Sequence, residues 1–369
     1  MPNFTVKLSI TVISSLMLYY IIKRFSVIFN INISKRVLLI APIIISIIIT
    51  LTFMYQWDNQ FLDIIGIIGS WLFVLAFILT ILLSIENLIS IRYKINPRII
   101  LWIIVLIFWV WAYFSLHTKI TYLDIETDKI NKDTKILLVS DIHAEYVTST
   151  YHINKIKRAI ETEKPDFTII AWDLINEPNI RYAKYFKNIK PNHDSLIFAV
   201  MWNHDTMWGI FDAIKKVSYE SRITFLNNKL ATYLNWCVNS DSGNCTWAIQ
   251  IIWLIDKYLW WNSNLDQNLK DAEVDKLNNR DNFTILVTHQ PISLEKLQNY
   301  PIDLEVAWHT HRGQFYWMRK VVQRMNEYTY WEYRLWDKIA FITQGIWTWW
   351  LPFRLWTQSE IVIINLKKK

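Results

Sequence analysis

The first part of the chain consists of long apolar runs separated by short polar links. Four runs are long enough to cross a bilayer, which takes about 20 residues. They cover residues 4–22, 37–56, 61–85 and 98–117. A buried core helix would explain one such run, but it does not explain four in succession. We therefore expect residues 1–117 to form a transmembrane region of four helices that anchors the rest of the chain.

After residue 117 the pattern changes to short apolar segments that alternate with mixed ones. Buried strands are predicted at 135–141, 166–171 and 195–201, with helices at 152–164, 182–189 and about 209–219. Further strands are predicted at 231–234, 248–255, 283–289, 303–309, 338–345 and 359–366, with fewer helices between them. Strands alternating with helices are typical of an α/β domain with a largely parallel centre, and the later strands indicate a second sheet. Residues 118–369 are expected to form this domain.

The charge distribution separates the two parts further. Residues 1–117 hold 8 Lys/Arg and 3 Asp/Glu, whereas the remaining residues hold 31 and 29. The domain is therefore nearly neutral and offers no broad basic face, so we expect no nucleic-acid partner. The basic residues gather in the first and third links between spans, which predicts that these links are cytoplasmic; only Lys7 argues against this. We expect an integral protein of a bacterial cell membrane, in contact with the lipid bilayer, whose domain lies outside the cytoplasm.

The cysteine content bears on the same question. Cys237 and Cys245 are the only two cysteines and flank a polar segment. A disulfide between them would persist only in an oxidising compartment, which agrees with an extracytoplasmic domain. Two unrelated thiols are the alternative. A zinc site is not expected, because no His or further Cys lies nearby.

Polar residues with metal-binding side chains follow the predicted strands. They are Asp141, His143, Asp173, Asn203, His204, His289, His309 and His311. Ligands in open α/β sheets bind at this edge. Carboxylate, imidazole and amide oxygen together suit Mn, Fe or Zn. Two such ions are expected to share a carboxylate and a bridging hydroxide and to clamp both oxygens of an in-line displacement at phosphorus.

These motifs, in this order, resemble the calcineurin-like metallophosphoesterase superfamily over about residues 134–366. The chain shows D-x-H, W-D, W-N-H-D, H and W-H-x-H where the family has D-x-H, G-D, G-N-H-D, H and G-H-x-H. The tail QGIWTWWLPFRLWTQSEIVI resembles the C-terminal signature of the membrane-associated YkuE/YaeI-type branch. The resemblance implies two mixed β-sheets packed together and flanked by helices.

The resemblance also implies a role for each site residue. One metal ion would be held by Asp141, His143, Asp173 and His311. The other would be held by Asp173, Asn203, His289 and His309, with Asp173 bridging the two. His204 would protonate the leaving oxygen or stabilise the transition state, assisted by Asp141. Arg312 would hold a substrate phosphate or lie on the surface, and Arg354 would approach the site or anchor its turn.

Tryptophan stands where the family pattern has glycine. The positions are Trp172, Trp202 and Trp308 beside the metal ligands, and Trp347, Trp350 and Trp356 in the tail. The chain has only 6 Gly, fewer than usual, and 21 Trp, more than usual. We hypothesise that the gene uses UGA for glycine and that the translation read UGA as tryptophan. The alternatives are a Trp-rich protein with a decayed site and a designed variant, because indoles beside the ligands would overfill the metal site.

The function expected from the sequence is that of a membrane-anchored binuclear phosphoesterase. It would hydrolyse a phosphomonoester, phosphodiester or pyrophosphate bond by a metal-bridging hydroxide. The anchor favours an envelope or lipid-linked substrate, and a UDP-diacylglucosamine-type lipid A precursor is a possibility at the family level. The alternative from another class is a catalytically inactive membrane scaffold, which would follow if the tryptophans are real. Nuclease action is weakened by the near-neutral domain.

Overall fold

The chain forms two compact units in the computed structural model, Met1–Tyr113 in the first and Phe114–Trp349 with Arg354–Lys369 in the second. The structure describes residues 4–54, 60–93, 96–142, 149–171, 186, 188–189, 195–200, 223–226, 231–233, 248–254, 269, 281–314, 316–347, 354–355 and 357–369. The predicted domain boundary after residue 117 lies close to this division.

The first unit is helical, as its apolar runs predict. Its helices are α1 (Phe4–Ile28), α2 (Lys35–Met54), α3 (Gln60–Ser90) and, extending into the second unit, α4 (Pro97–Leu116). Within the described residues, two helical segments are long and apolar enough to cross a membrane by length and composition, Leu8–Ile28 and Trp71–Ser90. Arg98–Phe114 is a shorter apolar helix. The four-span region therefore stays a prediction.

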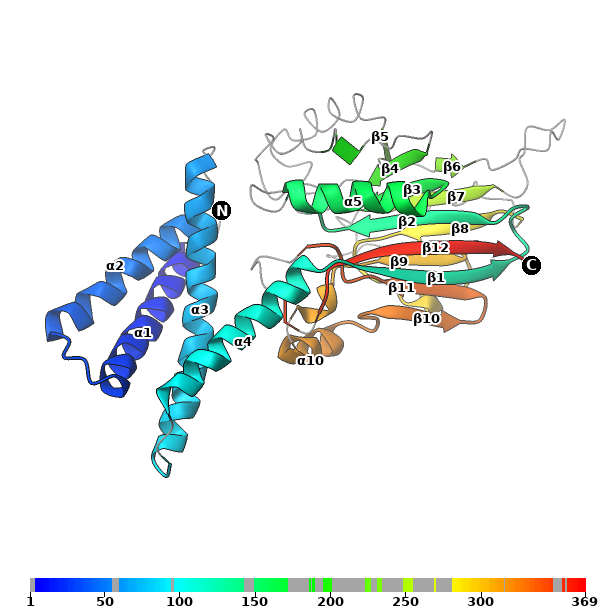
Figure 1. Cartoon of the computed structure of the whole chain (residues 1–369). Helices are drawn as coiled ribbons and strands as arrows, with labels where there is room; N and C mark the ends of the chain where they lie inside the picture. The colour runs from blue at the N-terminus through cyan, green and yellow to red at the C-terminus, as the bar shows by residue number, and fades with distance from the viewer. Residues whose placement is uncertain are drawn as a thin grey trace. The chain divides into compact units, whose positions relative to one another are not determined.

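The second unit contains two six-stranded sheets (Figure 1). The first has the order β1-β12-β2-β3-β4-β5 and the second the order β10-β11-β9-β8-β7-β6. The strands are β1 (Lys119–Thr127), β2 (Thr134–Ser140), β3 (Phe167–Ala171), β4 (Leu196–Val200), β5 (Ile223–Leu226), β6 (Ala231–Tyr233), β7 (Ile249–Trp253), β8 (Phe283–Val287), β9 (Leu304–Ala307), β10 (Trp331–Leu335), β11 (Lys338–Ile342) and β12 (Glu360–Lys368).

Both sheets combine parallel and antiparallel pairs. The run β2-β3-β4-β5 is parallel, and β12 joins it antiparallel to β2. In the second sheet β7, β8, β9 and β11 are parallel, whereas β6 and β10 are antiparallel edge strands. The prediction of two mixed sheets is confirmed.

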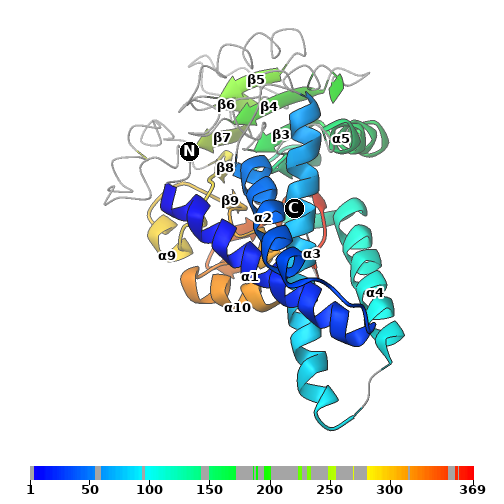
Figure 2. The same ribbon diagram turned by 90° about the vertical axis from the view of Figure 1, so that its left-hand side faces the viewer.

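Alternate residues of the strands face two different cores. Leu138, Ile169, Ile285 and Val306 contribute to the core between the sheets, which draws on both of them. Their neighbours along the strands face outward, where α5 (Ser149–Glu163) covers the first sheet and α9 (Leu294–Leu297) covers the second. Figure 2 shows α5 beside β3 and α9 near β9. Because these strands are buried on both faces, their segments are apolar runs and do not alternate with polar residues.

Three strands were not predicted. The clearest is β1, whose residues alternate between exposed and buried from Tyr122 onward and which pairs in parallel with β12. Its period-2 pattern was present in the sequence, with Asp124 and Glu126 at the exposed positions. β5 and β10 are short or carry mixed residues. Of the predicted helices, 209–219 and most of 182–189 lie outside the described residues.

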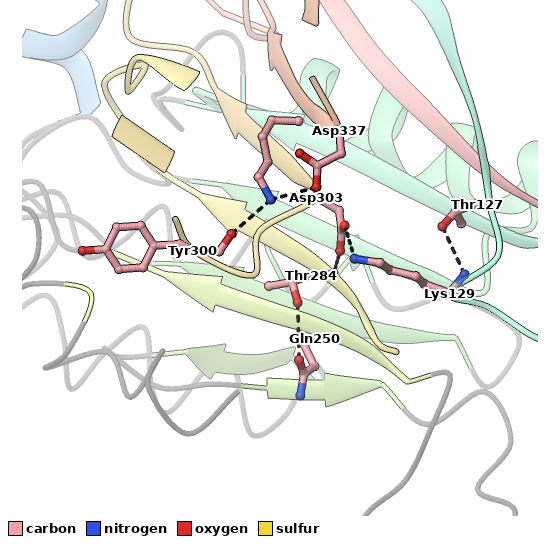
Figure 3. A network of polar contacts seen from close by, with 8 residues as sticks. Thr127, Lys129, Gln250, Thr284, Tyr300, Asp303 and Asp337 are labelled. Carbon is pink, nitrogen blue, oxygen red and sulfur yellow. Dashed lines mark hydrogen bonds and ion pairs between the residues drawn. The ribbon is translucent and has the colours of Figure 1, made fainter. Parts of the chain in front are cut away.

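A partly buried ion pair ties the β1–β2 connection to the second sheet (Figure 3). Lys129 Nζ lies 2.6 Å from Asp303 Oδ1, and the second carboxylate oxygen of Asp303 accepts a hydrogen bond of 2.8 Å from the main-chain N–H of Thr284. Burial raises the pKa of Asp303, and the hydrogen bond from Lys129 opposes this shift. The ammonium group therefore stabilises a carboxylate that would otherwise be costly to bury.

Lys129→Met is expected to lower the free energy of unfolding by about 3 kcal/mol at neutral pH, because it leaves the Asp303 carboxylate buried without its cation. Most of this loss should disappear in Lys129→Met/Asp303→Asn. Lys367→Met is a matched control: Lys367 also lies 2.6 Å from a carboxylate, that of Asp124, but both side chains are about half exposed. The control should lower stability much less, because an exposed ion pair is screened by solvent. Equal losses in both lysine variants, measured by denaturant unfolding, would contradict this.

Two tryptophans adopt a backbone conformation that favours glycine. Trp331 has φ +76° at the start of β10, and Trp336 has φ +54° in the two-residue turn between β10 and β11. A bulky residue in the left-handed region costs about 1–2 kcal/mol. These positions extend the hypothesis of misread glycine codons to two residues that lie outside the family motifs.

Trp336→Gly is accordingly expected to raise the free energy of unfolding by about 1 kcal/mol, since Trp336 is 61% exposed and little apolar burial is lost. Tyr122→Gly, at an exposed aromatic in a regular strand, should instead lower it. The gene should carry UGA at positions 331 and 336. UGG codons at both would contradict the hypothesis.

Candidate metal centre

The parallel strands carry the predicted metal ligands to one end of the two sheets. Asp141 follows β2 in the first sheet, His289 lies two residues after β8, and His309 lies two residues after β9. The carboxyl ends of β8 and β9 are joined by hydrogen bonds from Thr288 N to Val306 O (3.0 Å) and from Trp308 N to His289 O (3.3 Å). Residues far apart in the sequence therefore meet at this edge, as parallel pairing requires.

Four of the predicted ligands form two close pairs. His309 Nδ1 lies 2.7 Å from His289 Nε2, and His311 Nε2 lies 3.7 Å from Asp141 Oδ1. Asp141, His289 and His311 are all buried. Each pair belongs to a different one of the two ligand sets implied by the family resemblance. The structure therefore brings together two of the residues that the resemblance assigns to each ion.

The other predicted site residues lie outside the described residues. They are His143, Asp173, Asn203 and His204, with Trp172, Trp202, Trp350 and Trp356 and the predicted disulfide residues Cys237 and Cys245. Within the described part of the chain, no three His, Cys, Asp or Glu residues lie together as a metal site would require. The bridging position of Asp173 and the pairing of the cysteines stay predictions.

The chemistry of the described pairs fits divalent cations. Burial lowers the pKa of His309, which keeps its imidazole in the neutral form that binds metals. Burial raises the pKa of Asp141 to about 7, with the Ser140 hydroxyl and the charge of Arg354 opposing the shift. A carboxylate in such surroundings is favoured by a nearby cation.

The backbone at the site is strained. Asp141, His311 and Arg312 have φ of +52°, +42° and +52°, in the left-handed region that few residues other than glycine adopt. Such conformations cluster at functional sites, where the surrounding structure holds them in place.

Comparison with known proteins identifies the domain. Residues 134–313 match the family described as calcineurin-like phosphoesterase. The chain carries a calcineurin-like phosphoesterase domain. The predicted family is therefore confirmed, and the chain is a phosphoester hydrolase.

Proteins with similar sequences carry the same description. An uncharacterized metallophosphoesterase of Helicobacter pylori is 28% identical over 270 residues, covering 71% of this chain and 68% of that protein. One of Campylobacter jejuni is 25% identical over 256 residues, covering 68% and 64%. The uncharacterized metallophosphoesterase YkuE of Bacillus subtilis is 25% identical over 241 residues, covering 63% and 79%. A solved structure named GAP50, the anchor in the inner membrane complex of Plasmodium, has a TM-score of 0.38 at 12% identity over 58% of this chain and 72% of that chain, too low to support a conclusion.

The tail of the phosphoesterase domain closes over Asp141. Ile346 N donates to Ser140 O (2.9 Å) and Trp347 N donates to Asp141 O (3.0 Å). Gly345 has φ +71°, and a Cβ there would lie 2.3 Å from Asp141 Oδ2. The carboxylate of Asp141 is thus seated against a position that only glycine fills.

Arg354 organises this tail loop. Its side chain is fully buried, and its Nη2 donates to the carbonyls of Gln344 (2.7 Å), Gly345 (3.2 Å) and Trp347. Of the two roles expected for Arg354, this arrangement favours the anchor of the turn over a contact to substrate. Burial lowers its pKa to about 10, so it stays charged at neutral pH.

Arg312 lies directly after the ligand His311 and is half-buried. Its guanidinium carbon lies 4.0 Å from the centre of the Tyr330 ring, and the Tyr330 hydroxyl donates to Glu360 Oε1 (3.2 Å). Stacking on an aromatic face holds a guanidinium in one plane, which suits two-point binding of phosphate.

The two described tryptophans of the family motifs are buried. Trp308 is fully buried in the core between the sheets, with its ring centre 5.9 Å from that of His289. Trp347 packs in the core beneath α5, with its ring centre 4.7 Å from that of His152. The indole of Trp308 thus extends into the core beside a ligand.

Glu305 was not among the predicted site residues, although it occupies an otherwise apolar strand. It is fully buried in β9, four residues before His309. Its Oε1 accepts hydrogen bonds from Thr288 Oγ1 (2.8 Å) and Ile292 N (2.7 Å). These two residues flank His289, so one carboxyl group holds the turn that carries His289 against the strand that leads to His309.

Glu305 is expected to make stability depend on pH. Burial raises its pKa to about 8 from the ordinary 4.5. Between these values the folded state holds a proton that the unfolded state has released, so stability falls as pH rises, by up to about 1.4 kcal/mol per pH unit. Glu305→Gln removes this dependence. The melting temperature of Glu305→Gln minus that of wild type should therefore increase steadily between pH 5 and 8 and level off above that range. If the melting temperatures of the two proteins change in parallel with pH, the assignment is contradicted.

The same variants separate a positioning role from a purely structural one. Glu305→Gln keeps an acceptor for Thr288 and Ile292 and should retain activity. Glu305→Leu should lower metal affinity about 10- to 100-fold, as loss of groups that orient metal ligands does. Equal metal affinity in the folded Gln and Leu variants would show that Glu305 does not position His289.

Proposed function

We propose that the chain is a membrane-anchored phosphoesterase with two divalent metal ions, Mn, Fe or Zn, that acts on a phosphorylated lipid at the outer face of the membrane. The bond cleaved is a phosphomonoester, phosphodiester or pyrophosphate bond. A UDP-diacylglucosamine-type lipid A precursor is one substrate of this chemistry. The family and the two ligand pairs support the reaction, and the point at which the chain enters the domain supports the class of substrate.

The ligands for the two ions come from both sheets. Asp141 and His311, with His143, would hold one ion; His289 and His309, with Asn203, would hold the other; and Asp173 would bridge them. When bound, the ions supply Lewis-acid stabilisation of negative charge and activate water. The described pairs support this division, since His311 lies by Asp141 and His309 lies by His289.

Two further residues act on the substrate, and two others hold Asp141 in place. Arg312, stacked on Tyr330, binds an oxygen of the scissile phosphate. As water attacks phosphorus, the bond from phosphorus to the leaving oxygen breaks and His204 donates a proton to that oxygen, assisted by Asp141. Gly345 and Arg354 keep the Asp141 carboxyl in place through the tail loop. No Ser or Cys nucleophile is needed.

The observation that carries the lipid assignment is the position of the domain's entry point. Ser359 N donates to Phe114 O (3.4 Å), and Lys119 N donates to Ser359 O (2.8 Å). The next residue, Glu360, donates from its N–H to Gly345 O (3.0 Å), and Gly345 abuts Asp141. The chain therefore leaves the last predicted span at the same edge of the domain that carries the ligands. A substrate held in the bilayer surface reaches such an edge most readily.

The anchoring and its orientation rest on the basic links between the apolar helices. In the first unit Arg24 Nε lies 2.8 Å from Glu86 Oε2, so the carboxyl ends of α1 and α3 lie together. This supports a common side for the first and third links, which hold most of the basic residues. The positive-inside rule then assigns that side to the cytoplasm and the domain to the outside.

The reaction is tested on the full-length protein with glycine at positions 172, 202 and 308. Purified protein should contain close to two equivalents of transition metal and should hydrolyse bis-p-nitrophenyl phosphate with Mn, with loss of activity in chelator and recovery on adding metal. The protein with tryptophan at these positions is the comparison. Absence of both metal and hydrolysis in the glycine protein would favour the inactive scaffold.

The substrate class is tested with matched pairs of phosphoesters. A UDP-linked or phosphorylated diacyl lipid in mixed micelles should be hydrolysed at least tenfold more efficiently, by kcat/KM, than its deacylated headgroup. Equal efficiencies would leave the phosphoesterase reaction standing but would contradict a lipid substrate.

A further inference from the structure

The helix after the ligand turn exposes basic and apolar side chains together. α10 (Tyr316–Met325) has the sequence YWMRKVVQRM and contains no acidic residue. Arg319, Lys320 and Arg324 are exposed, and no ion pair joins any of them to another residue in the described ranges. Val321 is 43% exposed and Met325 is 78% exposed. Apolar side chains so exposed, beside positive charge that has no ion-pair partner among the described residues, suit a partner that offers both kinds of contact.

The exposed residues are ordered on the helix surface. Val321 and Met325 are four residues apart and lie on one face, as do Lys320 and Arg324 on the adjacent face. An apolar stripe flanked by a basic one is the pattern of helices that lie in the interface of a membrane, with the apolar side chains among the acyl chains and the cations at the headgroups.

The helix is fixed to the ligand edge of the domain. It packs on η4 (His311–Gly313), the turn that carries His311. A Cβ on Gly313 would lie 2.6 Å from the main-chain nitrogen of Arg319, so the helix and the turn are in direct backbone contact. In Figure 1, α10 lies at the end of the sheets at which β1 begins, where the chain arrives from the last predicted span.

We propose that α10 is a membrane-contact helix that binds the anionic lipid surface and holds the ligand edge of the domain against it. This proposal rests on the membrane anchoring of the proposed function. Three cations that form no ion pair in the described part of the chain complement acidic headgroups, and each basic residue near an anionic surface contributes about fivefold to binding. Val321 and Met325 add apolar burial. A second copy of the chain would be an alternative occupant and is distinguished by the test.

The test measures amide hydrogen exchange of residues 316–325 in the full-length protein held in lipid nanodiscs. Exchange of α10 should be more than fivefold slower in nanodiscs that contain phosphatidylglycerol than in nanodiscs of phosphatidylcholine alone. Lys320→Gln/Arg324→Gln should remove this difference. The matched control, Lys368→Gln/Lys369→Gln, removes the same charge from exposed lysines at the far end of β12 and should keep it.

The outcomes separate this proposal from the proposed function. Hydrolysis of the soluble substrate bis-p-nitrophenyl phosphate should be unchanged in Lys320→Gln/Arg324→Gln, because neither residue is part of the catalytic site. Equal exchange in the two kinds of nanodisc, with hydrolysis intact, would overturn the contact of α10 with lipid and leave the phosphoesterase standing. Protection of α10 from exchange in detergent, increasing with protein concentration, would overturn the lipid contact in favour of a second copy of the chain.

Discussion

Replacing His309 with alanine is expected to lower the rate of phosphodiester hydrolysis by at least about a hundredfold and to reduce the bound metal by about one equivalent. The reason is the 2.7 Å approach of His309 Nδ1 to His289 Nε2, because in the proposed function these two imidazoles hold one ion. Loss of groups that only orient a ligand already costs about 10- to 100-fold in affinity or activity, so loss of the ligand itself costs at least as much. The measurements are metal content by mass spectrometry and initial rates at saturating metal.

The two ligand pairs give this prediction its internal controls. His289→Ala should match His309→Ala, and the double variant should be little worse than either, since groups that act as a unit are not additive. His311→Ala should remove a different equivalent of metal, because His311 lies by Asp141. His117→Ala, at an exposed histidine, should change neither quantity. Full metal content in folded His309→Ala would show that His309 is not a ligand.

The second large effect is expected at a glycine that contacts no substrate. Gly345→Ala should lower activity by about a hundredfold or more, because the new Cβ would lie 2.3 Å from Asp141 Oδ2 and the residue has φ +71°. The contact involves the side chain of Asp141, which cannot retreat without leaving its position by His311. Overpacking of this kind typically also costs about 1–3 kcal/mol of stability.

A double-mutant cycle distinguishes this contact from backbone strain alone. In an Asp141→Ala background the carboxyl is absent, so Gly345→Ala should lose much less stability than it does with Asp141 present. The melting temperatures of the four proteins give the coupling. If Gly345→Ala lowers the melting temperature equally in both backgrounds, the strain at φ +71° is the whole cause and the proposed contact with Asp141 is not significant.

At the tryptophan positions, the sequence patterns and the tertiary structure give different information. Sequence patterns marked Trp308 and Trp347 as glycine positions, but the fold shows large buried side chains in two cores. At Trp331 the backbone gave the clearer signal, because its φ of +76° favours glycine although no sequence motif marks this position. Local conformation is visible only once the strand pairing of β10 with β11 is known.

Much of the fold and of the ligand set followed from the amino-acid order alone. Short, mainly apolar segments ending in Asp or His predicted β2, β8 and β9 together with Asp141, His289 and His309, because local periodicity and strand ends are short-range properties. Which residues meet was decided by the tertiary structure. Thr121 and Glu360, whose side chains hydrogen-bond at 2.7 Å, are 239 positions apart, and the contacts of Gly345 with Asp141 and of Glu305 with the His289 turn are likewise non-local. Such pairings depend on strand register and on packing across the sheets, and neither is encoded in the spacing of any single segment.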